Sequence, residues 1–442
     1  MRVVRDQQEA WAFVRRRGRS LSGPALPPSV AAHIRQVFGA DLSAREVVER
    51  ILLDVREQGD AALRHYSLAL DGVAVDKLEV TPGELDAARD RVPADLVRAM
   101  RVAVARILAY HHRQREAGPH SFEADGVGQI VQPLERVGIY IPGGAASYPS
   151  TVLMTAIPAR VAGVSEVVIC TPPRVGGVPP VVLVAAELVE VDRVFQVGGA
   201  AAIAAMAWGT ETLPRVDKVC GPGNIFVQLA KKAVFGEVGV DGIQGPTETV
   251  VLADDSASPA LCAADLLAQA EHDPMASPVL ITTSLKLAGA VAQEVDRQLG
   301  ILERQDIARQ AVDRQGAILL AGSMEQAMDM ANAYAPEHLC LMVRDPNAWG
   351  GRVRHAGGIF IGETSPEALG DYVAGPSHVM PTGGTARFSS ALGVYDFLKV
   401  TSLVSVDSKT FRETGPAAAL IARAEALTGH ARALEARLEG DR

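Results

Sequence analysis

Three polar side chains at helical spacing, Asp265, Gln269 and His272, could form one wall of a binding or catalytic site. Ser258 followed by Pro259 is typical of a helix start, and spacings of four and three then place the three side chains on one helical face. A carboxylate, an amide and an imidazole together can bind a metal ion or move a proton. The same pattern is also typical of a solvated stripe, so its interpretation depends on what else the fold brings to it.

A second pair of reactive side chains follows a proline. Glu337 and His338 come directly after Pro336, and the apolar run 339–343 behind them indicates a buried strand. An imidazole at the start of a buried strand is suited to acid–base catalysis. The alternative interpretation is that Glu337 is an acidic residue at a helix start and His338 a surface histidine.

The candidate metal ligands are oxygen and imidazole donors in loops or at helix ends. Asp371 and His378 lie in a loop rich in glycine and proline, and His430 lies near the C-terminus. A mixed set of this kind, without thiolates, suits zinc or manganese. The candidate ligands are Gln269, His272, Asp371 and His430, with His338 and His378 in reserve.

The remaining histidines and the cysteines look structural. His111 and His112, with His120 nearby, are adjacent on an expected helix and would point to different sides, so we expect them to be solvated. The cysteines share apolar surroundings and lack CxxC spacing, which predicts buried thiols and not disulfides or a thiolate zinc site. They are Cys170, Cys220, Cys262 and Cys340.

Composition and charge narrow the class of protein. The chain has 442 residues, of which 48% are hydrophobic and 21% charged, with a formal net charge of −9. This size allows two or more domains, and the acidic balance argues against a nucleic-acid partner. The basic run Arg15–Arg19 is interpreted as a solvated or subunit-contacting face. Without an apolar leader or a membrane-length apolar run, we expect a soluble, cytoplasmic protein.

The elements that position these residues alternate between strands and helices. A helix is expected at 7–14, and further helices from Ser43 to about Arg115. Strands at 138–142, 167–170 and 193–197 and helices at 150–162 and 181–188 then predict a parallel sheet. A second alternating region has strands at 250–253, 278–282, 317–320 and 357–361 and helices at 285–299 and 324–334. The tail is expected to end in a helix at 416–438.

Glycine turns follow three strands of the first alternating region, at Gly143-Gly144, Gly198-Gly199 and Gly221–Gly223. Parallel sheets bind ligands at the carboxyl ends of their strands, where backbone N–H groups and helix N-termini can receive phosphate. The G-x-G-x-x-G fingerprint is absent, so ordinary tight turns and a nucleotide site both remain open.

Several motifs in order along nearly the whole chain resemble those of the histidinol dehydrogenase family. They are Gly138–Gly144, Ser147–Met154, Cys220–Asn224, Gln269–His272, Ala335–Leu339, Gly370–Tyr372, His378–Thr382 and Glu425–His430. The resemblance implies a zinc-dependent, NAD-linked enzyme that oxidises L-histidinol through an aldehyde to L-histidine.

The resemblance also implies an α/β architecture of two incomplete Rossmann-like parallel-sheet domains, with small N- and C-terminal helical units, in an intertwined homodimer. The implied parts are a helical arm (1–33), a zinc- and substrate-side domain (34–137 and 249–392), an NAD-side domain (138–248) and a dimerisation tail (393–442).

Residue roles follow from the same resemblance. The zinc ligands would be Gln269, His272, Asp371 and, from the partner subunit, His430. His338 would be the general base of alcohol oxidation, and Glu337 would activate water for aldehyde oxidation. Substrate contacts would include Thr247, His338, His378 and, from the partner, Glu425, besides the metal ligands. Tyr140, Asn224 and the position of Ala201 would contact NAD.

Two positions depart from the family pattern. Ala201 stands where the family usually has glutamine after Gly-Gly-Ala, which removes one hydrogen bond to the cofactor. Thr247 stands where a serine is usual and adds a methyl group to the substrate pocket. One alternative is therefore a relative that oxidises another small polar alcohol, such as a sulfonated diol. The second alternative is a catalytically silent ligand-binding relative. The retained acid, base and metal ligands argue against it.

Overall fold

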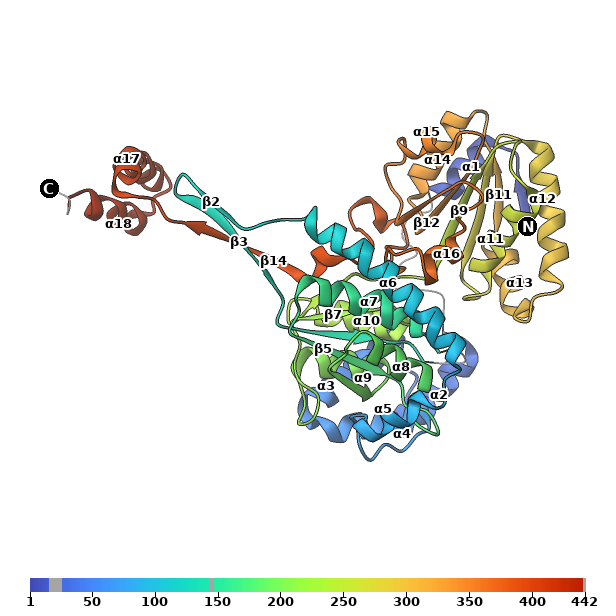
Figure 1. The fold of residues 1–442 in the computed structure, drawn as a ribbon, viewed down its shortest axis with the longest axis horizontal. Coiled ribbons are helices and arrows are strands. Elements are labelled where there is room, and N and C mark those ends of the chain that lie inside the picture. Colours follow the sequence, from blue (N-terminus) through green and yellow to red (C-terminus); the bar gives the residue numbers. More distant parts are fainter. Residues whose placement is uncertain (16–25, 144–146, 440–442) are drawn as a thin grey trace. The chain divides into compact units, whose positions relative to one another are not determined.

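The computed structural model describes the chain except residues 16–25, 144–146 and 440–442 (Figure 1). The basic residues after Arg15 and the glycine Gly144 therefore lie outside the described part. The chain forms two compact units, one of Met1–Glu116 and Leu134–Phe397 and the other of Ala117–Pro133 and Leu398–Arg442. Each unit is built around sheets of its own.

A five-stranded parallel sheet forms one half of the first unit. Its strand order is β6-β5-β4-β7-β8. The strands are β4 Arg136–Tyr140, β5 Glu166–Thr171, β6 Arg193–Gln196, β7 Lys218–Cys220 and β8 Gly239–Val240, and the helices between them are α7 Pro149–Ala162, α8 Pro180–Leu188, α9 Gly199–Trp208 and α10 Ile225–Val234. Helices on both faces bury these strands, which explains why β5 reads as an uninterrupted apolar run.

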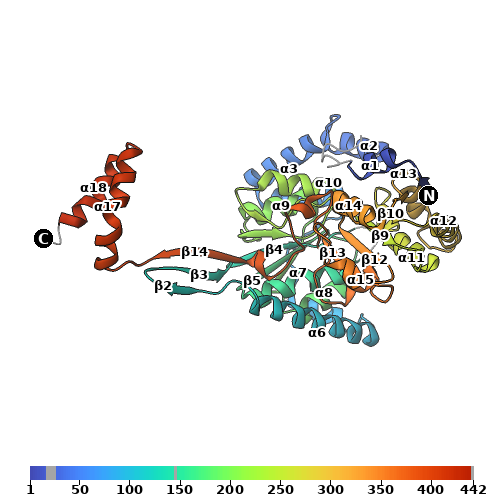
Figure 2. The same cartoon turned by 90° about the horizontal axis from the view of Figure 1, so that it is seen from above.

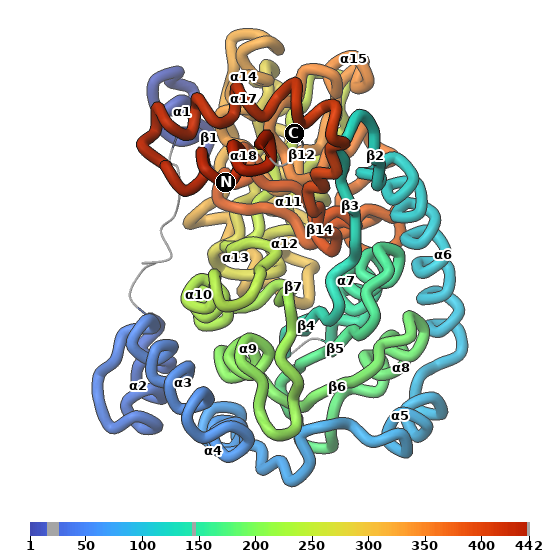
Figure 3. The backbone as a smooth tube through the Cα atoms, turned by 90° about the vertical axis from the view of Figure 1, so that its left-hand side faces the viewer, coloured from blue at the N-terminus to red at the C-terminus, as the bar shows by residue number. Residues whose placement is uncertain are grey.

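The helices that precede this sheet pack on it, which corrects the expected domain division. They are α2 Pro28–Phe38, α3 Ala44–Gln58, α4 Asp60–Asp71, α5 Pro82–Arg89 and α6 Ala94–Glu116. The apolar stripe of α3, which includes Val47, Ile51 and Val55, shares one core with α9 and α10. In Figure 3 the blue helices α2, α3 and α4 lie beside α9 and α10. Residues 34–116 therefore belong with the five-stranded sheet and not with the six-stranded sheet.

A six-stranded parallel sheet forms the other half of the first unit, with the order β1-β11-β10-β9-β12-β13. Its strands are β1 Arg2–Val4, β9 Glu248–Ala253, β10 Ser277–Thr282, β11 Ala317–Leu320, β12 His338–Met342 and β13 Gly358–Ile361. One face carries α11 Pro259–Ala270, α12 Leu285–Leu299 and α13 Gln305–Arg314, and the other carries α1 Gln7–Val14 and α14 Met324–Tyr334. The short helices α15 Pro346–Gly350 and α16 Glu367–Tyr372 follow β12 and β13.

The N-terminal segment corrects the expectation of a separate helical arm over 1–33. The helix at Gln7–Val14 is confirmed, but Arg2–Val4 is an edge strand that pairs in parallel with β11. Main-chain pairing and the buried Val4 and Ala10 attach this segment to the six-stranded sheet. With only three residues, Arg2–Val4 is too short to show an alternation that would indicate a strand.

The second unit combines an antiparallel sheet with a helix pair. The sheet order is β14-β3-β2, formed by β2 Phe122–Ala124, β3 Val127–Pro133 and β14 Leu398–Val404. The expected tail helix at 416–438 is instead two helices, α17 Ser408–Ala424 and α18 Thr428–Glu439, which pack against each other (Figure 2). Ala426 has a φ of 60°, which interrupts the helix. The expected tail of 393–442 thus begins at 398 and gains residues 117–133.

Some side-chain expectations are confirmed and one is wrong. All four cysteines are buried and free. Among the histidines, however, His111 is fully buried in α6 with Nδ1 3.0 Å from Gln114 Oε1, so the solvated interpretation fails for it. One face of α6 packs against α7, and His111 lies on that face with Ala103 and Ile107. Within the described residues, no helix combines the length and apolar character needed to cross a membrane.

Candidate active site

The strongest cluster of reactive side chains lies at the amino edge of the six-stranded sheet. Thr247 directly precedes β9, Glu337 precedes β12, and His338 is the first residue of β12. The two strands are neighbours, and His338 pairs in register with Thr249. This edge is opposite to the carboxyl edge at which parallel sheets usually bind ligands.

Hydrogen bonds connect residues that are far apart in sequence. The hydroxyl Oγ1 of Thr247 lies 2.7 Å from Gln269 Oε1 and 2.6 Å from Glu337 Oε2. Because the hydroxyl has one hydrogen, it donates to one of these oxygens at a time and links them. The backbone N–H of Glu248 also donates to Glu337 Oε2, at 3.1 Å. Burial raises the pKa of Glu337, although His338 and these hydrogen bonds oppose the rise.

The imidazole of His338 is buried between two carboxylates. Its Nδ1 lies 3.3 Å from Glu248 O and 3.7 Å from Glu337 Oε2, and its Nε2 lies 3.6 Å from Asp371 Oδ1. The ring stacks on Phe360 at 5.6 Å between centroids. Burial disfavours the charged imidazole, but Glu337 and Asp371 outweigh it and raise the pKa of His338 to about 10. Among the described residues, its buried Nε2 has no hydrogen-bond partner.

Gln269 and His272 lie where α11 ends, and the helix prediction needs one correction. Gln269 is in the last turn, but α11 ends at Ala270, and His272 lies two residues beyond it in a turn. The His272 N–H donates to the Gln269 carbonyl at 3.1 Å, so the chain turns toward β10 at this point. Burial lowers the pKa of His272 despite the nearby Asp371. Its imidazole is therefore neutral at pH 7, which is the form that binds metals.

Asp371 lies among three imidazoles. Its carbonyl oxygen is 2.8 Å from Nδ1 of His378, whose Nε2 is 3.3 Å from Thr151 Oγ1. Burial alone would raise the pKa of Asp371, but His338, His378 and His272 lower it below its ordinary value. An ionised carboxylate surrounded by imidazoles is suited to hold a cation.

The donor chemistry fits zinc, but the first unit supplies only part of a ligand set. Within the described residues, no group of three or more His, Cys, Asp or Glu side chains is arranged to hold a metal. His272 and Asp371 are two such donors and Gln269 adds an amide oxygen, which leaves one ligand of a four-coordinate site to be found. Glu425 and His430 lie exposed in the second unit, at the end of α17 and in α18.

The candidate cofactor residues meet at the carboxyl edge of the five-stranded sheet. A pocket of about 360 Å³ is lined by Tyr140, Ala201 and Asn224, together with Gly143, Gly198 and Gly199. The Gly199 N–H donates to the Tyr140 phenol oxygen at 3.0 Å. Asn224 Oδ1 caps α10 by accepting from two backbone N–H groups, so its Nδ2 is the group that can donate to a ligand.

The same pocket has an acidic lining residue that the sequence analysis did not single out. Asp71, at the end of α4, lines it, and burial raises the pKa of this carboxyl to about 6. Asp71 is the last residue of α4. The expected domain division placed this helix with the six-stranded sheet, so Asp71 was not considered as a residue of the cofactor pocket.

Two carboxyls are buried behind the active site, of which the sequence analysis named Asp265 and missed Glu367. Glu367 Oε2 accepts from Thr249 Oγ1 at 2.7 Å, while Glu367 Oε1 and Asp265 Oδ2 are buried without a hydrogen-bond partner among the described residues. Burial raises the pKa of Glu367 to about 8 and that of Asp265 to about 6. Each carboxyl lies four residues before a candidate ligand, Asp371 or Gln269, and this helical spacing is the signal that could have found Glu367.

Two parallel sheets, with a glycine-lined pocket on one and a buried acid–imidazole cluster on the other, are typical of an α/β oxidoreductase. Comparison with known proteins is more specific. The family model of histidinol dehydrogenase matches residues 36–438. The chain belongs to the histidinol dehydrogenase family, which consists of NAD-dependent oxidoreductases.

Individual relatives agree with this assignment. The histidinol dehydrogenase of Deinococcus radiodurans is 52% identical over 425 residues, which cover 95% of this chain and 97% of that protein. That of Dehalococcoides mccartyi is 48% identical over 440 residues, covering 99% of this chain and 100% of that protein. The crystal structure of histidinol dehydrogenase from Elizabethkingia anophelis has a TM-score of 0.90 at 33% identity and covers 100% of this chain and 98% of that one.

Proposed function

We propose that this chain oxidises L-histidinol through L-histidinal to L-histidine in two NAD-linked steps, in the cytoplasm, as part of histidine biosynthesis. The observation that carries the proposal is the convergence of Thr247, Gln269, Glu337, His338 and Asp371 at one sheet edge in a chain of this family. This cluster contains both an acid and a base for a four-electron reaction.

Zinc is the metal that the donor set favours. Gln269, His272 and Asp371 would hold it together with His430 of the partner subunit, in a homodimer with shared active sites. Bound zinc supplies a Lewis acid and a template for the amino and imidazole groups of the substrate. The neutral His272 and the ionised Asp371 support this assignment.

His338 acts as the base for the alcohol step. Its Nε2 takes the hydroxyl proton as the hydride departs, and Phe360 and Glu248 O hold the ring in place. The nearby carboxylates of Glu337 and Asp371 raise the pKa of the imidazole. The negative charge of the Asp371 carboxylate would be offset by the zinc that it holds, and the pKa of His338 would then lie closer to the working range of a general base.

Glu337 acts in the aldehyde step. One of its oxygens is held by Thr247 Oγ1 and by the Glu248 N–H, so the carboxylate has a fixed orientation. Its raised pKa suits a group that removes a proton from water as the water attacks the aldehyde. The resulting hydrate gives up the second hydride.

The remaining groups bind substrate and cofactor. Thr247, His378 and the partner subunit's Glu425 complete the substrate shell. Tyr140, Asn224 and the surface at Ala201 bind NAD, with the glycine turns leaving room for its phosphates.

A relative that oxidises a sulfonated diol remains the alternative within enzymes. An anionic tail would need an arginine or lysine at the substrate's far end, whereas the groups assembled here are carboxylates, imidazoles, an amide and a hydroxyl. This chemistry favours a cationic, imidazole-bearing substrate. A silent ligand-binding relative would have no use for an acid and a base held this closely.

The test is NADH formation by the zinc-loaded protein with L-histidinol, with the L-histidine product counted. The proposal expects two NADH per histidine. Turnover of a sulfonated diol but not of histidinol would favour the changed-substrate alternative, and binding of both ligands without turnover would favour the silent one.

A further inference from the structure

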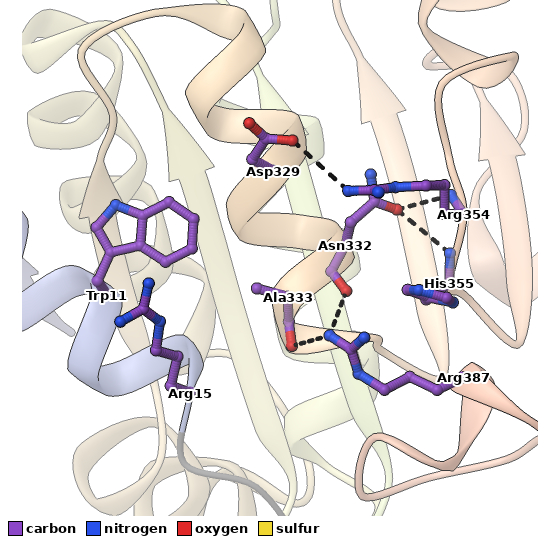
Figure 4. A pocket seen from close by; sticks show the side chains of 8 residues that line it. All are labelled: Trp11, Arg15, Asp329, Asn332, Ala333, Arg354, His355 and Arg387. Atoms are coloured by element: carbon purple, nitrogen blue, oxygen red, sulfur yellow. Dashed lines mark hydrogen bonds and ion pairs between the residues drawn. The ribbon is translucent and has the colours of Figure 1, made fainter.

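A second hollow in the six-stranded half lies apart from the catalytic residues. It has a volume of about 590 Å³ and lies over α14, near the end of that helix (Figure 4). None of Glu337, His338 and Asp371 lines it. The hollow is therefore a separate candidate site.

Three guanidinium groups from separate segments converge on this hollow. Arg15 comes from the end of α1, Arg354 from the loop before β13, and Arg387 from the short 3₁₀ helix η1 Thr385–Arg387. Among the lining residues that the structure describes, the only carboxylate is Asp329, which lies 3.8 Å from Arg354. Three cations against one anion make a positive site in a chain whose net charge is −9.

The guanidinium of Arg387 and the backbone at Arg354 are held by the fold. Arg387 Nη2 donates to the carbonyls of Asn332 and Ala333 at 3.0 and 2.9 Å, where they end α14. The side chain of Asn332 is buried, and its Oδ1 accepts from the backbone N–H groups of Arg354 and His355 at 2.7 and 3.2 Å. The loop that carries Arg354 is thus fastened to the same helix end, so the site is preorganised.

The remaining walls add an aromatic ring and an imidazole. The Arg15 guanidinium lies 4.9 Å from the Trp11 ring centroid. Burial, Arg387 and Arg354 lower the pKa of His355, so this imidazole is neutral and can donate or accept a hydrogen bond. Guanidinium forks match the geometry of phosphate oxygens, and an aromatic wall suits a ring attached to the phosphate.

Two of the three arginine-bearing segments, those of Arg354 and Arg387, are hydrogen-bonded to residues at or next to the catalytic ones. Beyond His355, Gly357 N and Gly358 N donate to the carbonyls of Pro336 and Glu337 at 2.9 and 2.8 Å. The segment before Arg387 contacts the first residue of β9, since the Gly383 N–H donates to Glu248 Oε2 at 3.1 Å. Movement of the Arg354 segment would therefore act on the backbone of Pro336 and Glu337, and movement of the Arg387 segment on the side chain of Glu248, next to Thr247.

We propose that this hollow is a binding site for a small phosphate monoester and that its occupancy changes the catalytic rate through these two segments. The phosphate lies between Arg354 and Arg387, with Arg15 at the side, and Trp11 faces the ester group. The site does not depend on the substrate assigned to the enzyme, because it shares no lining residue with the active site.

The test is a titration of the zinc-loaded enzyme with inorganic phosphate and with phenyl phosphate, at constant ionic strength and without substrate. Tryptophan fluorescence and calorimetry report binding, since Trp11 lines the site. We expect saturable binding with a Kd on the order of 1 mM or below, and tighter binding of the phenyl ester. Arg354→Gln should weaken binding by about tenfold or more, because a charge-assisted hydrogen bond is lost.

Two further variants make the result specific. Arg15→Gln should weaken binding without removing a helix-end contact, whereas Arg387→Gln would also uncap α14 and is avoided. Arg344→Gln is the matched control, because Arg344 is exposed in the loop after β12 and pairs only weakly with Asp255 at 3.2 Å. This control should bind phosphate like the unchanged protein.

Absence of saturable binding, or equal binding by Arg354→Gln, Arg15→Gln and the control, would overturn the site. The second arm measures NADH formation with and without saturating phenyl phosphate. A change in rate that Arg354→Gln abolishes supports the coupling, and binding without any change in rate overturns it. Because binding is measured without substrate, failure of the site is distinguishable from failure of the proposed reaction.

Discussion

The two sheets of the first unit present their functional residues at opposite edges. In the five-stranded sheet, Tyr140, the Gly198-Gly199 turn and Asn224 follow the carboxyl ends of strands and line one pocket. In the six-stranded sheet, Thr247, Glu337 and His338 cluster before or at the amino ends.

The difference follows from what each edge offers. A carboxyl edge with glycine turns provides backbone N–H groups and helix N-termini, which suit a phosphate-bearing cofactor. The amino edge here receives the end of α11 and the short helix α16, which corrects the expected loop position of Asp371. These helices bring side chains of catalytic type, including Gln269 and Asp371. Binding of cofactor and catalysis are thus assigned to separate sheets, and they should respond to separate mutations.

The largest expected effect is at the amino edge. Asp371→Asn removes the ionised carboxylate, and zinc affinity should fall by about a hundredfold or more, since even outer-shell partners are worth 10- to 100-fold. Turnover should fall with it, while NADH binding stays within about twofold of the unchanged protein. Metal content and NADH fluorescence measure the two quantities. Asp255→Asn, at an exposed carboxylate, is the control, and a parallel loss of NADH binding would contradict the separation.

The second largest effect is expected on the stability of the protein, at the carboxyl edge of the five-stranded sheet. Gly221 has a φ of 111°, and a Cβ there would overlap the Tyr140 carbonyl oxygen. Gly221→Ala should lower the free energy of unfolding by roughly 2 to 4 kcal/mol. Gly199, with a φ of 58° and open space around it, is the matched control, and its change to alanine should cost about 1 kcal/mol. Equal losses in urea unfolding would show that the close approach at Gly221 is not required.

The next effect concerns pH and the buried carboxyl behind His338. Burial raises the pKa of Glu367 to about 8, whereas a carboxyl of the unfolded chain titrates near 4.3. Between those values the folded protein holds a proton that the unfolded chain releases, so this group makes stability fall as pH rises from about 5 to about 8.

Glu367→Gln removes that titration and should flatten the decline, with a relative gain on the order of 2 kcal/mol at pH 8 over pH 5. Thermal midpoints at pH 5, 6, 7 and 8 measure it. Glu303→Gln, at an exposed glutamate, should leave the profile unchanged. Parallel profiles for Glu367→Gln and the unchanged protein would show that Glu367 is ionised in the folded state.

The smallest effect is expected at Ala201. Ala201→Gln restores the amide that the family pattern has at this wall of the cofactor pocket, and one hydrogen bond should tighten NADH binding by about fivefold. Ala201→Leu adds similar volume without the hydrogen bond and should not tighten it. If both variants bind NADH equally, the departure at this position has no bearing on cofactor affinity.

Local patterns predicted the elements well. The helices at Gln7–Val14, Leu285–Leu299 and Met324–Tyr334 and the strand at Ala317–Leu320 have the expected bounds, because apolar periodicity and flanking polar or glycine residues define them locally. The glycine turns were also recognisable, since a turn and the strand before it are adjacent in sequence.

Contacts between residues far apart in the sequence could not be predicted from local patterns. Thr247 contacts Glu337 across 90 residues, and Thr249 contacts Glu367 across 118, only because β9 and β12 pair in one particular register. Nothing local in α3 shows which of two sheets its apolar stripe will cover. Donor types in the sequence, together with the motif resemblance, supplied the candidate ligands. The structure added Glu367, the burial of Asp265 and the order of the strands.

The most direct test of the account is a comparison of the two half-reactions in Glu337→Gln and His338→Asn, each given L-histidinol or L-histidinal with NAD. The account predicts that Glu337→Gln still oxidises the alcohol but loses aldehyde oxidation by about a hundredfold or more, and that His338→Asn loses alcohol oxidation. Equal loss of both half-reactions in both variants would contradict the division of labour between Glu337 and His338.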